Sequence, residues 1–211
     1  LVRSADDFEV DGSGSNPSWR RADWVPLRRR QPEGLPYDAR FKLLHAPKGI
    51  YLLIEGGDRK LSAAIDKDFG LLWTEDVFEA FFWPDERHPL YFEYEISPLG
   101  RELPILVPNA DGKFHGWLPW MYAGPRRVRK AVAVLGGEAK SGAAIQGWRA
   151  EVFFPYELLK PLQNVPPAPG SRWRANFYRI DTDDGRTTQW DWSPVGPGFH
   201  EIRKFGVLVF E

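Results

Sequence analysis

The sequence predicts an all-β protein, an antiparallel β-sandwich of the immunoglobulin or jelly-roll kind with at most one short helix. Many short segments alternate between apolar and polar residues, which is the pattern of strands with one buried face. The 19 Pro and 20 Gly are spread along the chain, as in a protein made of strands and turns. Long stretches of helical periodicity are missing, and strands without helices between them favour two packed antiparallel sheets.

One domain is expected over residues 1–211. All-β sandwiches often reach this size as a single unit. The sequence contains no internal repeat and no linker that would divide it. A chain of this length can also bury a proper hydrophobic core.

The expected strands follow one another along the chain. A hairpin is predicted from residues 39–44 and 49–55, with Ala46, Pro47 and Lys48 at its turn. Further strands are predicted at residues 76–83, 90–97, 101–107, 127–135, 147–154, 171–180 and 205–210.

Turn and helix signals lie between these strands. The segment from Asn109 to Gly112 and the Asp184-Gly185 pair have the residue types of tight hairpin turns. Residues 155–162 could form the one short helix, because Pro155 stands near its start.

Alternation assigns one face of each strand to the core and leaves an unusual opposite face. The predicted core residues include Phe78, Ala80, Phe82, Leu90, Phe92, Tyr94, Ile96, Trp148, Ala150, Val152, Phe154, Trp173, Ala175 and Phe177. The opposite faces carry Glu79, Glu93, Glu95, Arg174, Asn176 and Tyr178. Such groups near tryptophans suit a polyol, whose hydroxyls need polar partners and whose C–H faces need planar apolar ones. An ordinary solvated sheet face explains the same pattern, and both interpretations remain open.

The composition argues against several classes of partner. The formal net charge is −1, so the chain lacks the excess of positive charge that nucleic-acid binding favours. Without cysteine, disulfides, thiol catalysis and Cys-based zinc sites are excluded. No apolar run approaches the length of about 20 residues that spans a membrane.

Catalytic and metal motifs are mostly missing. The chain has no Walker loop and no Gly-x-Ser-x-Gly elbow, and no metal-ligand spacing links its four histidines. Glu93 and Glu95, about 6–7 Å apart along one strand face, do not exclude a glycoside hydrolase, but nothing marks either as an acid. Asp181, Asp183 and Asp184 could hold a structural calcium ion, although a hairpin turn also explains Asp184.

Three ordered segments carry a resemblance. They are Trp73 to Phe82 with Tyr91 to Gly100, then Trp173 to Arg179, and finally Trp192-Ser193-Pro194 followed by Phe199-His200 and Phe205-Gly206. Together they resemble the carbohydrate-binding module family 9-like domains, relatives of the DOMON sandwiches, over nearly the whole chain. The resemblance implies a β-sandwich that binds a sugar between two Trp rings.

The resemblance also implies site residues. Trp73 matches the first stacking Trp, Glu79 a carboxylate that binds hydroxyls, and Arg101 an Arg that bonds to the sugar. The second Trp is Trp190 or Trp192.

Two amide side chains are further candidates for the site. Gln189 is a candidate amide partner of the sugar, because it stands beside the two candidates for the second Trp. Asn176, on the polar face of its strand, is another candidate ligand-binding residue.

The expected function is therefore a non-catalytic carbohydrate-binding domain. Its partner would be a mono-, oligo- or polysaccharide, such as a glucan or xylan chain end, within a larger glycan-degrading system. A secreted, periplasmic or cell-surface location goes with this function, although no signal peptide is visible.

Two other functions remain open at the level of sequence. A haem-binding DOMON-like redox module would need axial ligands, for which Met121 and His115 are the candidates. A structural or docking domain of a larger assembly would use its tryptophans in the core or in an interface.

Overall fold

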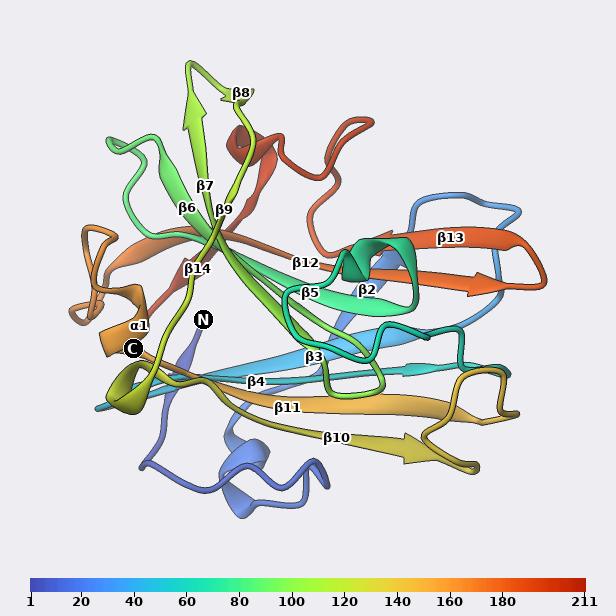
Figure 1. The fold of residues 1–211 in the computed structure, drawn as a ribbon. Helices are drawn as coiled ribbons and strands as arrows, with labels where there is room; N and C mark the ends of the chain where they lie inside the picture. The colour runs from blue at the N-terminus through green and yellow to red at the C-terminus, as the bar shows by residue number, and fades with distance from the viewer.

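Fourteen strands form a sandwich of two layers in the computed structural model, which describes residues 1–211 (Figure 1). The first layer contains, in spatial order, β10 (Arg129–Leu135), β11 (Gly147–Pro155), β4 (Gly49–Gly57) and β3 (Ala39–Ala46). The second contains β13 (Arg186–Asp191), β12 (Arg172–Asp183), β5 (Val77–Trp83), β6 (Leu90–Ile96) and β7 (Glu102–Ala110). All neighbours in these two layers pair antiparallel, as predicted.

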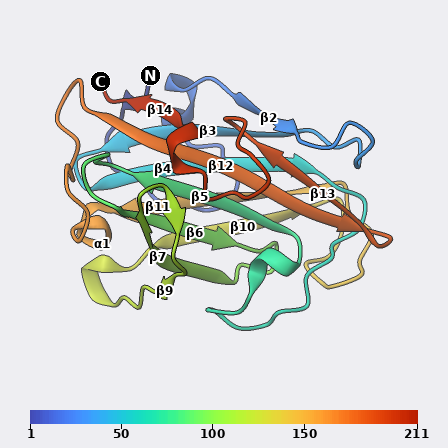
Figure 2. The same cartoon turned by 90° about the horizontal axis from the view of Figure 1, so that it is seen from above.

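One strand belongs to both layers. In β2 (Val25–Arg29), the residues from Val25 to Leu27 pair with β3, whereas Arg28 and Arg29 pair with β13. The two layers are therefore joined by backbone hydrogen bonds along one side. Figure 2, seen from above, shows the strands of the second layer crossing those of the first at an angle.

Short elements complete the fold. The small strands are β1 (Arg3–Ser4) on β3, β8 (Lys113–Phe114) and β9 (Leu118–Pro119) on β7, and β14 (Gly206–Val209) on β12. The predicted helix is confirmed as the single turn α1 (Tyr156–Leu159). Four 3-10 turns are η1 (Pro17–Arg21), η2 (Leu72–Thr74), η3 (Gly124–Arg126) and η4 (Ile202–Lys204). No helix has the length and the apolar character that crossing a membrane requires.

Both predicted hairpin turns are confirmed by left-handed backbone. Asp111 and Gly112, between β7 and β8, have φ angles of 56° and 74°. Asp184 and Gly185, between β12 and β13, have φ angles of 49° and 77°. Asp-Gly pairs tolerate these angles, which match the twist of the flanking strands.

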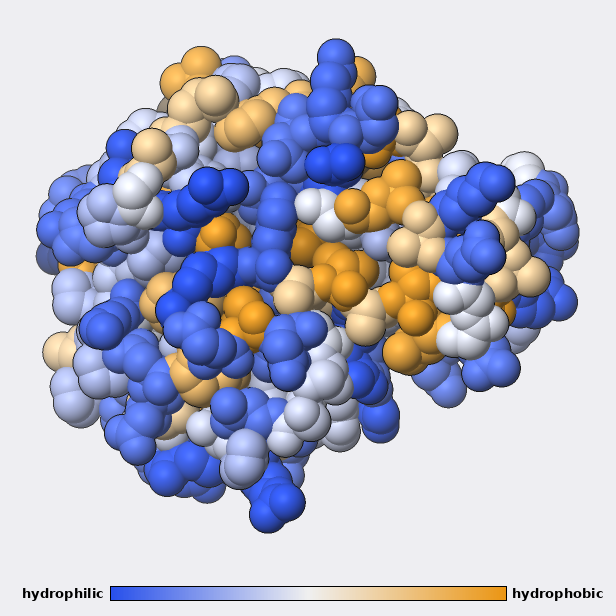
Figure 3. Space-filling model, turned by 60° about the horizontal axis from the view of Figure 1, so that its bottom comes forward, coloured by the Kyte–Doolittle hydropathy of each residue, from blue (hydrophilic) through white to orange (hydrophobic).

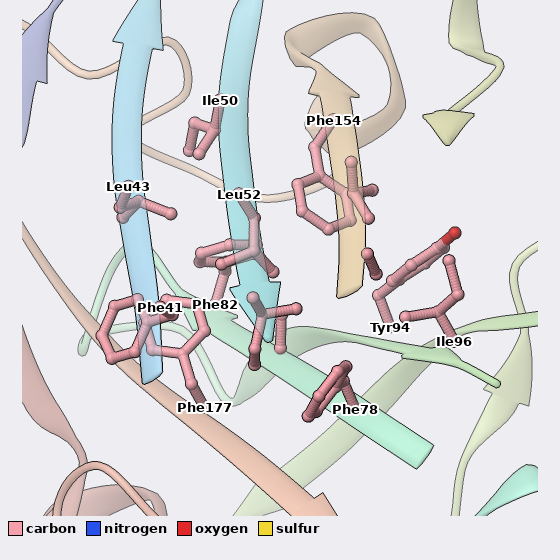
Figure 4. Packing of buried hydrophobic residues seen from close by; sticks show 14 of the residues in the cluster. Phe41, Leu43, Ile50, Leu52, Phe78, Phe82, Tyr94, Ile96, Phe154 and Phe177 are labelled. Carbon is pink, nitrogen blue, oxygen red and sulfur yellow. The ribbon is translucent and has the colours of Figure 1, made fainter. Parts of the chain in front are cut away.

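The main core lies between the layers, as the alternation predicted. Figure 4 shows side chains of β3, β4 and β11 meeting those of β5, β6 and β12. Two aromatic stacks cross the interface: the ring centroids of Phe41 and Phe177 are 4.1 Å apart, and those of Phe78 and Trp148 are 3.8 Å apart. Trp173 is also fully buried here.

The outer face of the second layer is covered rather than solvated. Loops before β5 and after β13 pack a second apolar cluster on it, which includes Leu72, Phe81, Tyr91, Tyr178 and Phe205. The interpretation of an ordinary solvated sheet face is therefore wrong for β5, β6 and the middle of β12. Figure 3 shows one face of the whole molecule. Polar residues cover much of this face, and apolar residues gather toward its middle and right-hand side.

An ionic cluster closes one end of the main core. Arg179 has no exposed surface; it donates a hydrogen bond to Asp181, and its Nη2 lies 3.5 Å from Oδ2 of Asp58. The guanidinium also lies over the Trp190 ring, 4.9 Å from the centroid. Gly56 allows this approach, because a Cβ there would lie 2.4 Å from Arg179 Nη1.

The Arg179→Met variant should therefore be much less stable than the wild type. Removing the cation leaves buried carboxylates without compensation, which typically costs about 3–5 kcal/mol. Urea denaturation measures the free energy of unfolding. The control is Arg172→Met on the same strand, where the side chain is exposed; it should change stability by less than about 0.5 kcal/mol. Equal stabilities of the two variants would contradict the role given to Arg179.

Candidate functional site

A cavity of about 400 Å³ opens on the outer face of the second layer. It lies among η2, the β7–β8 hairpin and the loop that follows β13, segments that surround this face in Figure 1. Its lining residues are Trp73, Glu79, Phe81, Glu93, Glu95, Ile105, Phe114, Trp117, Ile180, Gln189, Pro197, Gly198, Phe199 and His200. The volume is in the range of small-molecule sites.

Three glutamates form most of the polar part of this lining, beside Gln189 and His200. Glu79 on β5 stands directly opposite Glu95 on β6, and Glu93 is opposite Phe81. The two-residue period of a strand places all three on the face opposite the main core. They are only 3%, 4% and 1% exposed, in the order Glu79, Glu93, Glu95. The alternation of two neighbouring strands thus brings three carboxyl groups together in a low-dielectric site.

Burial changes the titration of these carboxyl groups. Desolvation raises the pKa of Glu79 to about 8. It raises the pKa of Glu93 and Glu95 well above the usual value, and repulsion from the neighbouring glutamates adds to this. Because burial penalises the charged form and no ion pair offsets it, the protonated form is favoured.

Two tryptophans stand next to each other on the wall of the cavity. The ring centroids of Trp73, in η2, and Trp117, between β8 and β9, are 5.8 Å apart with planes at 77°. The Glu75 carboxylate fixes the η2 loop, because it accepts hydrogen bonds from the backbone N–H groups of Ala64 and Ile65 at 2.8 and 3.0 Å. Both indoles are partly exposed, so the wall presents aromatic surface to the cavity.

His200 links the loop after β13 to the other side of the cavity. Its ring lies 5.6 Å from the ring of Phe81 and 4.1 Å from that of Phe114, and is stacked with both. Nδ1 is 3.8 Å from Oε2 of Glu93. Burial lowers the pKa of His200 to about 4, so the imidazole is neutral near pH 7 and supplies no positive charge.

The adjacent residues Gln189 and Trp190 lie on opposite faces of β13. Trp190 is 1% exposed, belongs to the main core, and donates its indole N–H to the carbonyl of Tyr37. Gln189 consequently faces the other way and lines the cavity. Trp190 is therefore a core residue and does not reach the cavity with Trp73.

Trp192 is also directed away from the cavity. Its ring packs against Phe41 and Phe177 at the edge of the main core, with centroids 5.7 and 5.8 Å away. The chain passes close over this ring at Gly206, where a Cβ would lie 2.5 Å from the indole. Neither predicted second Trp lies beside Trp73. The tryptophan beside Trp73 is Trp117, which lies outside the regular strands and offered no periodic signal.

Arg101 and Asn176 do not line the cavity either. Arg101 lies in the turn between β6 and β7, where its N–H bonds to Oγ of Ser97. Asn176 is fully buried, and its amide bonds to the Tyr178 hydroxyl at 2.7 Å and to both backbone groups of Ser193. Its side chain thus ties the loop after β13 to the sheet.

The two candidate haem ligands lie elsewhere. Met121 is 65% exposed, and Nε2 of the exposed His115 contacts the carbonyl of Ala110. Neither residue lines the cavity with the aromatic wall. The geometry therefore gives no support to an axial His–Met pair in this site.

A metal ion could be held by a different set of carboxylates from the predicted one. Oxygen atoms of Asp58, Asp181 and Asp183 lie within 4.8 Å of one another. Asp184 is instead exposed in its turn, 3.3 Å from the Lys60 ammonium. The guanidinium of Arg179 already contacts two of the three carboxylates, so the protein itself supplies a positive charge there.

Because Glu79 and Asp181 are buried, the free energy of unfolding of the domain should fall as pH rises from about 6.5 to about 8. Glu79, with a pKa near 8 in the folded state, binds more protons there than in the unfolded state. Asp181, whose pKa burial raises to about 8, acts in the same direction. His200 opposes this change only below its unfolded pKa of about 6.5. The wild type should therefore unfold at lower urea concentration at pH 8.5 than at pH 6.5.

The Glu79→Gln variant should lose part of this pH dependence. The exposed Glu157→Gln variant should keep all of it. A stability that rises over this pH range in the wild type would contradict the assignment.

Comparison with known proteins agrees with this architecture. No family model matches the chain. A protein of Arthroderma benhamiae named "Extracellular protein" is 28% identical over 192 residues, which are 85% of this chain and 82% of that protein.

Three solved structures share the fold over the whole chain. A candidate carbohydrate-binding protein of Bacteroides uniformis has a TM-score of 0.78 at 18% identity, with 97% of its own chain covered. A family 9 module of Caldicellulosiruptor kristjanssonii in complex with cellotriose has a TM-score of 0.71 at 15% identity, with 93% covered. The same kind of module in complex with glucose has a TM-score of 0.70 at 14% identity, with 95% covered. The chain is thus a β-sandwich with the fold of the carbohydrate-binding module family 9 domains.

Proposed function

We propose that this domain binds a saccharide in the cavity between Trp73, Trp117 and the three glutamates. The observation that carries the proposal is the combination of aromatic surface and buried carboxyl groups in one cavity of about 400 Å³. A sugar needs both kinds of surface at once, because its C–H faces are apolar and its edges carry hydroxyls.

The polar groups are suited to hydroxyl donors. One oxygen each of Glu93 and Glu95 is buried without a hydrogen-bond partner in the protein. An unpaired buried acceptor typically costs about 1–3 kcal/mol. A bound hydroxyl, which can both donate and accept, removes this cost by pairing with such an oxygen, and Gln189 on β13 adds an amide that also donates and accepts.

The aromatic platform of this proposal differs from the predicted one. Trp73 keeps the role that the resemblance implied. Trp117 replaces Trp190 and Trp192, whose indoles lie in and beside the main core. The two cavity tryptophans are nearly perpendicular, so they would contact two different faces of a ligand rather than hold it between parallel rings.

The similar proteins support a glucan ligand and a location outside the cell. The two family 9 modules are in complex with cellotriose and with glucose. The relative from Arthroderma benhamiae is named an extracellular protein. We therefore place this domain among secreted or surface proteins that attach to β-glucans, as one part of a glycan-degrading system.

Binding should take place without cleavage. Glycoside hydrolysis needs one protonated and one ionised carboxyl group, on either side of the scissile bond. Here burial raises the pKa of all three glutamates, and all three project from one sheet face. The site therefore lacks a pair of carboxyl groups on opposite sides of a bound sugar.

Replacement of either cavity tryptophan by Ala should weaken binding of cellotriose at least about thirtyfold, or about 2 kcal/mol, since a buried Trp contact of this kind is commonly dominant. Isothermal titration calorimetry measures the dissociation constant. The control is Trp24→Ala, because Trp24 is partly exposed and lies against Arg40 of the other layer. If Trp24→Ala weakens binding as much as Trp73→Ala and Trp117→Ala do, the cavity is not the site.

Cellotriose incubated with the wild-type domain should remain intact. Chromatography of the mixture after a day would reveal any glucose or cellobiose released. Release that is lost in Glu79→Gln would show hydrolysis and would overturn the non-catalytic assignment.

A further inference from the structure

The cavity has an unbalanced set of charged groups. Three of its lining residues are acids, and none is Lys or Arg. His200, its only other titratable side chain, is neutral near pH 7 because burial lowers its pKa to about 4. Arg30 stacks on the Phe199 ring at 4.9 Å, but it does not line the cavity and already pairs with Asp191 at 3.6 Å. The protein therefore supplies no cation to the three glutamates.

Two of the cavity glutamates also have an oxygen atom that no group of the protein satisfies. Glu93 and Glu95 are more than nine-tenths buried, both line the cavity, and each has an oxygen with no hydrogen-bond partner. Elsewhere buried acids have partners inside the protein: Arg179 pairs with Asp58 and Asp181, and backbone N–H groups donate to Asp76 and Glu151. The three glutamates differ from these acids because they line a cavity, where a ligand can reach them.

The wall is also suited to a cation. Aromatic faces attract ammonium groups, with a stronger effect where water is excluded. Trp73, Trp117, Phe114 and Phe199 all line the cavity beside the carboxyl groups. A hydrogen bond between an ammonium and a carboxylate is roughly twice as strong as one between neutral partners. An amine would use both kinds of surface more fully than a hydroxyl does.

We infer that the cavity prefers saccharides with a free amino group, of the 2-amino-2-deoxyglucose type, over their N-acetylated and neutral counterparts. This inference rests on the proposed saccharide-binding function and specifies its ligand class. The ammonium takes the place of a counter-ion to Glu79, Glu93 and Glu95, while the sugar ring contacts the tryptophans. Binding then ionises carboxyl groups that burial otherwise keeps protonated, so protons are released to the buffer.

The test compares three β-1,4-linked trisaccharides by calorimetry at pH 6.5: the glucosamine trimer, its fully N-acetylated form, and cellotriose. The glucosamine trimer should bind at least about tenfold more tightly than the other two. Titrations in phosphate and in MES, which differ in ionisation enthalpy, should show proton release for the glucosamine trimer alone.

A variant pair locates the effect. Glu93→Gln should bring the affinity ratio of the glucosamine trimer to cellotriose toward one, whereas Glu157→Gln, with an exposed glutamate on α1, should leave the ratio unchanged. If Glu93→Gln does not fold, the proton release of the wild type remains the deciding measurement.

The outcomes separate this inference from the proposed function. Tight binding of cellotriose with no preference for the amino trimer and no proton release would overturn the amine selectivity and leave saccharide binding intact. Absence of binding by all three trisaccharides would overturn both.

Discussion

The two-residue period of the central strands is the constraint on which the rest of this structure depends. In β5, β6 and β13, each residue that enters the main core sends its neighbour to the outer face. Phe78 and Trp190 are packed between the layers, and for that reason Glu79 and Gln189 must face the loops. A shift of pairing by one residue would exchange the two sets and place carboxyl groups in the main core. The register of strand pairing thus determines both which side chains pack in the core and which side chains line the cavity.

Covering the outer face with loops gives the cavity its chemical character. An antiparallel sheet commonly leaves one face in water, where glutamates cost nothing. Here the loop before β5 and the loop after β13 bury the three glutamates on that face, and the pKa of each carboxyl group rises. The side chain of Asn176, which bonds to Ser193, helps to hold the second loop in place. Residues that touch no ligand therefore control the electrostatics of the site.

The chain contains two buried groups of acids, and the free-energy cost of burying their charge is lowered differently in each group. At the end of the main core, Arg179 enters the group and pairs with Asp58 and Asp181, so the charge is balanced inside the protein. In the cavity no lysine or arginine approaches Glu93 and Glu95. Protonation lowers the cost of burying them, and a bound ligand would lower it further. The charge of the first group is balanced inside the protein, and the second is the group that we propose for ligand binding.

Local sequence determined nine of the fourteen strands, the two Asp-Gly turns, the short helix and the inward faces of β5, β6, β11 and β12, because these depend on neighbours within a few residues. It did not predict β2 and β13, the strands through which the two layers are joined. The outward position of Glu79, Glu93 and Glu95 follows from the same alternation. Tertiary structure decided which indole meets Trp73: Trp117 lies outside any periodic segment, whereas Trp190 and Trp192 are drawn to the core by the register of β13 and by Phe41. Tertiary structure also decided that the glutamates are buried, since their burial depends on loops far away in the chain. Register and loop packing are long-range properties, and no short stretch of sequence contains them.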